Sequence, residues 1–201
     1  MNPLIHSTKI FTPCRTKLLR GACHLFFAFG ILALGYAGIV FADSHIYQDV
    51  EAQKFERTTA SPVPHALAQG DMMGEIQVPR LGINAIVIQG DSAADLRRAV
   101  GHLSSSALPG DWGNVALAGH RDTFFRPLRD IRVGDEIKFK TSEHTFEYRV
   151  DSIEVVGPGD IGVLKATTGH YLTLLTCFPF HYIGPAPKRF VVRARENDAS
   201  P

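Results

Sequence analysis

Short apolar or alternating runs, separated by Gly, Pro and Asp, recur through the chain after about position 75. These runs cover residues 75–78, 85–88, 114–120, 135–140, 145–150, 153–156, 171–177 and 189–195. Their length, pattern and flanking turn formers predict β-strands. The spacing of Leu96, Val100 and Leu103 after Asp91-Ser92 predicts one short helix. About eight short strands with little helix predict an all-β barrel or sandwich.

The pattern differs near the N-terminus, where residues 21–41 contain no Asp, Glu, Lys or Arg. In a helix this run is about 30 Å long, which is enough to cross a bilayer. Charged residues flank it: Lys9, Arg15, Lys17 and Arg20 precede it, and Asp43, Asp49 and Glu51 follow it. The positive-inside rule predicts a single-pass protein of the cell membrane, with a cytoplasmic N-terminus and an extracytoplasmic domain. A cleaved signal peptide is the alternative, but the length of the run and the bulky Ile39-Val40-Phe41 favour a retained anchor.

These patterns divide the chain into five parts. We expect a cytoplasmic N-terminus at 1–20, a transmembrane anchor at 21–41, a juxtamembrane stalk and linker at 42–71, a folded domain at 72–196 and a tail at 197–201. The linker assignment depends on Pro62 and Pro64, which stand among small residues. The only tryptophan, Trp112, is expected to pack against the core of the folded domain.

Charge and cysteine content narrow the classes of function. The chain has 201 residues, with 21 Lys and Arg against 20 Asp and Glu, and a formal net charge of +1. Such a balance, without a basic stripe, argues against nucleic acid as a partner. The 3 cysteines are Cys14, Cys23 and Cys177, and the first two belong to the N-terminal region. One remaining cysteine builds neither a disulfide framework nor a cysteine-based zinc site, so we expect no metal site.

Cys177 stands at the end of the predicted strand 171–177. His120 ends the predicted strand 114–120 in the same way. A thiol at one strand end, with a histidine at another, is typical of a nucleophilic cysteine and its acid–base partner. The alternative is a buried structural cysteine and a histidine that only hydrogen-bonds within a loop. Taken singly, these residues leave both interpretations open.

Three segments are more informative together. They are Leu117-Ala118-Gly119-His120-Arg121, Thr173-Leu174-Leu175-Thr176-Cys177 and Lys188-Arg189-Phe190-Val191-Val192. With Gly110-Asp111-Trp112-Gly113-Asn114 and Arg132-Val133-Gly134-Asp135, they strongly resemble the sortases, a family of membrane-anchored cysteine transpeptidases. The short segment 178–188 is most similar to class D or a related proteobacterial branch. The resemblance covers about residues 74–194 and implies a closed eight-stranded sortase-type β-barrel with short helices, preceded by one transmembrane helix.

The resemblance also implies a role for each matching residue. Cys177 would be the nucleophile, and His120 would be the general acid and later the base. Arg189 would stabilise the oxyanion or position the substrate. Thr176 would lie beside the site and help to bind the substrate backbone. Asp122 is expected to be a loop carboxylate rather than a third member of a catalytic triad.

The same resemblance predicts the partners. The substrate would be an exported protein with a C-terminal sorting motif, Leu-Pro-x-Thr followed by a small residue, cleaved after the Thr. A thioester acyl-enzyme would pass the acyl group to an amine of a peptidoglycan precursor or another protein, without a cofactor. Some sortases bind calcium through acidic loop residues, but 178–188 contains no Asp or Glu. Two alternatives remain: an envelope enzyme of the L,D-transpeptidase type, and a non-catalytic anchored scaffold or thiol redox sensor.

Overall fold

The computed structural model describes residues 13–57, 67–164 and 168–197. Its contacts divide the chain into two compact units, Met1–Asp43 and Ser44–Pro201. Three expected segments lie partly outside the described residues: the N-terminus before 13, the linker at 58–66 and the tail after 197. The domain boundaries given above for these segments stay predictions.

The apolar N-terminal run lies within one long helix, α1 (Pro13–Arg57). Its segment Arg20–Ile39 has a mean hydropathy of 1.8 and is long enough to cross a membrane. The helix continues from there without a break into the residues expected to form the stalk. A membrane anchor near the N-terminus is therefore compatible with the structure.

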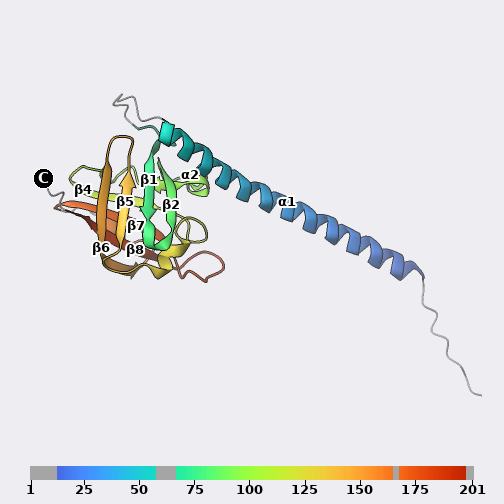
Figure 1. The fold of residues 1–201 in the computed structure, drawn as a ribbon. Helices are drawn as coiled ribbons and strands as arrows, with labels where there is room; N and C mark the ends of the chain where they lie inside the picture. The colour runs from blue at the N-terminus through green and yellow to red at the C-terminus, as the bar shows by residue number, and fades with distance from the viewer. Residues whose placement is uncertain (1–12, 58–66, 165–167, 198–201) are drawn as a thin grey trace, which may run out of the picture. The chain divides into compact units, whose positions relative to one another are not determined.

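Eight strands form the folded domain (Figure 1). They are β1 (Met72–Val78), β2 (Ile83–Gln89), β3 (Val100–His102), β4 (Gly113–Ala118), β5 (Glu136–Lys140), β6 (Thr145–Val156), β7 (His170–Phe178) and β8 (Lys188–Glu196). They close into a barrel in the order β1-β2-β3-β4-β7-β8-β6-β5. The ring is completed by antiparallel pairing of β1 with β5. The predicted all-β, closed eight-stranded barrel is confirmed.

Two element boundaries differ from the prediction. The short helix α2 (Ala93–Arg98) is capped by Ser92, as expected, but it ends before Val100. Val100 belongs to β3 and pairs with Val87 of β2, so a tertiary contact decides a position whose spacing also fits a helix. Residues 145–156 form one strand rather than two. A bulge between Val150 and Ser152 shifts the pairing with β8, and the strand continues on both sides of it.

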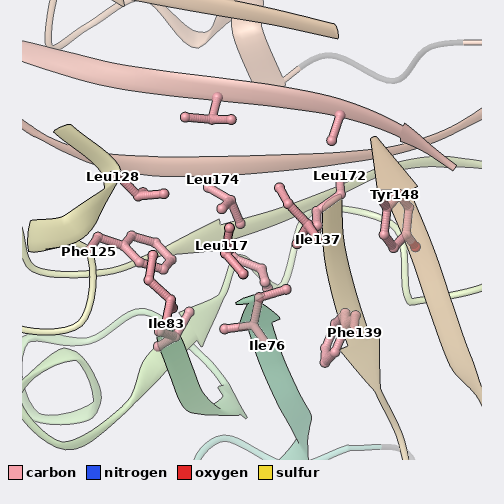
Figure 2. Close-up of a cluster of buried hydrophobic side chains, with 14 of the residues drawn as sticks. Ile76, Ile83, Leu117, Phe125, Leu128, Ile137, Phe139, Tyr148, Leu172 and Leu174 are labelled. Carbon is pink, nitrogen blue, oxygen red and sulfur yellow. The ribbon is translucent and has the colours of Figure 1, made fainter. Parts of the chain in front are cut away.

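The core lies inside the barrel, where alternate residues of each strand point inward. Figure 2 shows Ile76, Leu117, Ile137 and Leu174 meeting there from four different strands, and all are fully buried. The short 3-10 helices are η1 (Pro79–Leu81), η2 (Arg126–Asp130) and η3 (Ile161–Leu164). Leu128 of η2 is also fully buried in this core. Leu128 thus anchors the segment that follows β4 to the core inside the barrel.

The last turns of α1 contact the barrel within the second unit. The Gln48 side chain accepts a hydrogen bond from the Ile86 N–H at 2.8 Å and donates one to the Arg98 carbonyl at 2.7 Å. Tyr47 and Ala52 pack against a small cluster that contains Ile86. This part of the expected stalk is therefore attached to the folded domain.

The expectation for Trp112 was wrong. Its side chain is 68% exposed, so it is not a core residue. Its ring instead packs against the His170 ring in a T-shaped arrangement, with centroids 5.1 Å apart. The loop before β4 carries Trp112 outward, because Gly113 directly after it begins the buried strand.

Candidate active site

Cys177 and Arg189 are partners across the antiparallel ladder of β7 and β8. Directly opposed residues share one face of a sheet, with Cβ atoms about 5 Å apart. Leu174 and Val192, a partner pair on the opposite face, are fully buried in the barrel. Cys177 and Arg189 therefore lie on the outer face of the barrel, where both are partly exposed.

His120 reaches the same region from β4. This strand runs parallel to β7, with Ala118 opposite Leu175. The Gly119 N–H donates to the Leu175 carbonyl at 3.1 Å, which extends the ladder by one residue. The next step brings the backbone of His120 to the level of Cys177. The side chain of His120 is exposed, and nothing in the described part of the chain hydrogen-bonds its ring.

The backbone at His120 is fixed by the residue before it. A Cβ atom on Gly119 would lie 2.7 Å from the ring of Phe125, which is fully buried. The Phe125 N–H donates to the His120 carbonyl at 3.1 Å. The chain after His120 thus folds back against the core, and glycine leaves the space that this approach needs.

Thr176, which we expected beside the substrate, is only 3% exposed. Its hydroxyl donates to the Gly119 carbonyl at 2.7 Å. This bond joins the residue before Cys177 to the residue before His120. A contact between Thr176 and the substrate stays a prediction, whereas its contact with Gly119 holds β4 and β7 together at the site.

The Arg189 guanidinium is held near its own backbone. Its Nη1 donates to the carbonyls of Ala186 at 3.3 Å and Lys188 at 3.1 Å. A guanidinium has five N–H groups, so others are left for a ligand. Lys188 pairs with Phe178, and alternation along the strand puts its side chain on the opposite face from Arg189. Arg189 is therefore the better placed of the two to donate to an oxygen near Cys177.

Arg121 belongs to the segment 117–121 that carries the resemblance, but no role was expected of it. It is only 7% exposed, and its guanidinium donates to the carbonyls of Pro179 at 2.8 Å, Tyr182 at 2.5 Å and Gly184 at 3.3 Å. These acceptors lie on the segment between Cys177 and Arg189. Backbone carbonyls occur at every position, so no sequence signal identifies such a contact.

Asp122 has the loop position expected of it. Its side chain is 72% exposed and forms an ion pair with the Nε of neighbouring Arg121 at 3.5 Å. Across the residues that the structure describes, no group of three or more His, Cys, Asp or Glu is arranged to hold a metal ion. The side chains at the neighbouring ends of β4, β7 and β8 are an imidazole, a thiol and a guanidinium.

An open pocket lies beside these residues on the outer face. Its lining consists of Ser152, Glu154, Asp160, Gly162, Val191 and Arg193. Val191 pairs with Leu175 of β7, one step along the same face from the pair of Cys177 and Arg189. Two residues of a strand span about 7 Å, so the pocket is within reach of a peptide bound at Cys177. Acidic and basic side chains both line it, which suits a polar ligand group.

Comparison with known proteins identifies the family. The family model described as "Sortase domain" matches residues 76–197. Sortase D of Bacillus subtilis is 33% identical over 126 residues, which are 61% of this chain and 63% of that protein. Sortase A of Staphylococcus aureus is 30% identical over 136 residues, which are 63% of this chain and 65% of that protein. The chain thus spans less than two thirds of the length of these relatives.

The fold gives the same result. A solved structure of a Clostridium perfringens sortase D5 transpeptidase superimposes with a TM-score of 0.66 and 26% identity, over 78% of this chain and 99% of that one. The matched region 76–197 contains His120, Cys177 and Arg189. Because this region is more than half of the chain and folds into the same barrel, the protein belongs to the sortase family.

Proposed function

We propose that the protein is a cysteine transpeptidase, which cleaves a sorting motif in an exported protein and transfers the acyl part to an amine. The pairing of Cys177 with Arg189 on an outer face next to the end of β4, where His120 lies, is the observation that carries the proposal. Membership of the sortase family supports it. The same membership counts against the L,D-transpeptidase and scaffold alternatives.

In the first half-reaction, the thiolate of Cys177 attacks the carbonyl carbon of the peptide bond after the motif's Thr. The carbonyl oxygen becomes an oxyanion, to which Arg189 donates hydrogen bonds. The carbon–nitrogen bond then breaks, and the imidazolium of His120 gives its proton to the departing amine. The product is a thioester between Cys177 and the substrate's new C-terminal carbonyl.

In the second half-reaction, an amine attacks the thioester carbon. His120, now neutral, takes a proton from this amine, and Arg189 again stabilises the oxyanion. The carbon–sulfur bond breaks and returns the thiolate of Cys177, so the site is restored without a cofactor. A thioester suits this two-step reaction because it stays reactive toward amines while the acceptor binds.

The substrate in this proposal carries Leu-Pro-x-Thr followed by a small residue. An extended peptide with its Thr carbonyl at Cys177 would run along the outer face toward the pocket beside Val191. The acceptor is an amine of a peptidoglycan precursor or of another protein. The charges around 21–41 favour a cytoplasmic N-terminus by the positive-inside rule, and in this proposal Cys177 acts outside the membrane.

The experiment is to incubate the detergent-solubilised full chain with a library of motif peptides and an amine. We expect mass spectrometry to find an acyl group on Cys177, and Cys177→Ala to abolish it. His120→Ala and Arg189→Ala should each lower the acylation rate by about 100-fold or more. Lys188→Ala is the matched control, and it should behave like the wild type. A wild-type chain that acquires no acyl group from any library member would overturn the proposal.

A further inference from the structure

The segment between β7 and β8, residues 179–187, connects Cys177 to Arg189 and is fixed in an unusual way. The backbone–backbone hydrogen bonds of the described residues include none from this segment. Phe180 packs against the core at its start, but residues 181–185 are exposed, and Ile183 is 98% exposed. A segment with so few contacts of its own would be free to open locally.

Arg121 supplies the missing contacts. Its Nη1 binds the Pro179 carbonyl, and its Nη2 binds the carbonyls of Tyr182 and Gly184. The Tyr182 ring also lies 6.0 Å from the guanidinium carbon, within reach of a cation–π contact. One side chain thus spans most of the segment. A planar fork of donors is suited to several acceptors at once, which an ammonium group is not.

The burial of this guanidinium makes the contacts strong. The Arg121 side chain is 8% exposed, while its carboxylate neighbour Asp122 is 72% exposed and 3.5 Å away. A buried charge is stable only where hydrogen bonds replace its water. The three carbonyls do this, so the guanidinium and the segment stabilise each other in one arrangement.

The same segment holds the guanidinium of Arg189. Nη1 of Arg189 donates to the carbonyl of Ala186, two residues after Gly184. Arg121, which binds the same segment, directly follows His120 in the chain. Hydrogen bonds therefore connect the strand end that presents His120 with the segment that presents Arg189, and the segment begins two residues after Cys177.

We infer that Arg121 is a positioning residue for the reaction proposed above, on which this inference rests. It holds residues 179–187 so that the Arg189 guanidinium stays aligned with Cys177 beside His120. It touches neither substrate nor reacting atoms. Its effect is on the fraction of molecules in which the oxyanion donor is in place, so its loss lowers kcat more than it raises KM.

The test compares Arg121→Ala, Arg121→Lys and Arg126→Ala in the full chain, with acylation kinetics on the best library peptide. Arg126 is an exposed arginine at the start of η2, five residues after Arg121, and serves as the matched control. We expect Arg121→Ala to lower kcat by about 10- to 100-fold with a much smaller change in KM. Arg121→Lys should recover only part of the rate, and added guanidinium should restore part of the activity of Arg121→Ala.

Limited proteolysis gives a second measurement that needs no turnover. Chymotrypsin should cut after Tyr182 faster in Arg121→Ala than in wild type, because cleavage requires residues 179–187 to open locally. If Arg121→Ala does not fold, Arg121→Lys decides the matter by the same two measurements. Wild-type kcat and wild-type cleavage rates in the folded variants would overturn this inference alone. A wild-type chain without acyl-enzyme would overturn the proposed function instead.

Discussion

Thr176 donates its hydroxyl hydrogen to the carbonyl oxygen of Gly119 at 2.7 Å, and both residues are buried. Each stands directly before a residue of the proposed reaction, Cys177 and His120. The parallel ladder between β4 and β7 ends at this point, since the Gly119 N–H already binds the Leu175 carbonyl. The hydroxyl therefore fixes the separation of the two strands where the thiol and the imidazole emerge.

Thr176→Val keeps the side-chain shape and removes the donor. The Gly119 carbonyl would lose a partner in a buried position, which costs about 1–3 kcal/mol. We expect the free energy of unfolding to fall by this amount, as measured by chemical denaturation, and the acylation rate to fall with it. Thr176→Ser keeps the hydroxyl and is the control. Equal losses in the Ser and Val variants would show that packing, rather than the hydrogen bond, is responsible.

The sequence was sufficient where a local pattern decides the structure. The run 171–177 has strand composition and ends at Cys177, and the structure has β7 there. Val100 shows the limit, because it fits the helical spacing from Leu96 and also a strand. Its pairing with Val87, thirteen positions earlier in the chain, decides between them, and single-residue propensity carries no information about that contact.

The candidate site shows the same division. Cys177, His120 and Arg189 are chemically distinctive side chains at strand ends, so their motifs are visible in the sequence. The contacts of Arg121 are with carbonyls, which every residue carries and no composition reveals. Gln48 is similar, since its two partners are the Ile86 N–H and a carbonyl, and it was expected only in a stalk.

Gln48 provides a second prediction. It satisfies the Ile86 N–H of β2 and the Arg98 carbonyl at the end of α2, so it attaches the end of α1 to the barrel. Gln48→Ala should lower the free energy of unfolding by about 1 kcal/mol. In hydrogen exchange of the full chain, the Ile86 amide should lose protection. Gln53→Ala removes an exposed glutamine of the same helix and should change neither measurement; an unchanged Ile86 amide in Gln48→Ala would contradict the attachment.

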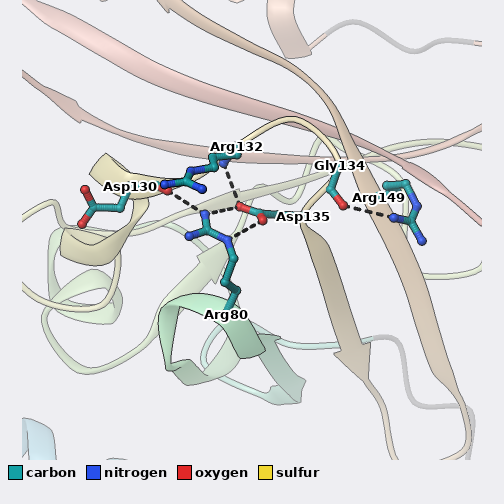
Figure 3. Close-up of polar contacts among 6 residues, drawn as sticks. All are labelled: Arg80, Asp130, Arg132, Gly134, Asp135 and Arg149. Atoms are coloured by element: carbon teal, nitrogen blue, oxygen red, sulfur yellow. Dashed lines mark hydrogen bonds and ion pairs between the residues drawn. The ribbon is translucent and has the colours of Figure 1, made fainter.

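The ion pair of Arg80 with Asp135 provides a third prediction (Figure 3). Arg80 Nε and Nη2 each lie 2.6 Å from an Asp135 carboxylate oxygen, and Nη2 also donates to the Asp130 carbonyl. The hydrogen bond from Arg80 is the main cause that lowers the pKa of Asp135 from its ordinary 3.8. Unfolded chains therefore take up the proton at higher pH than the folded protein. The stability from this carboxylate is complete above pH 3.8 and is lost as pH falls toward the lower folded value.

The measurement is the Tm of wild type and Asp135→Asn between neutral and strongly acidic pH. The variant should melt lower at neutral pH, and the difference should shrink as pH falls below 3.8. Asp130→Asn is the control, because that carboxylate is 65% exposed and its ion pair is with the exposed Arg129. A difference for Asp135→Asn that stays constant down to the lowest pH would mean that its charge does not contribute.

A buried histidine provides the last prediction, at a different pH. His102 is 1% exposed, with Nδ1 2.7 Å from the Gln89 Oε1 and Nε2 2.9 Å from the Ala107 carbonyl. Burial is the main cause that lowers the pKa of His102 from 6.5. The unfolded chain then binds this proton first, so the stability is complete above pH 6.5 and decreases as pH falls toward the lower folded pKa.

We expect the Tm of the full chain to fall between pH 7 and about pH 5, and His102→Gln to lose most of this slope while it melts lower at pH 7. His144→Gln removes an exposed histidine of the β5–β6 hairpin and should keep the wild-type slope. The pH range in which His102 affects stability lies above that of Asp135. One series of melting curves over pH therefore separates the contributions of the two groups to stability. An unchanged slope in His102→Gln would show that other groups cause the loss of stability.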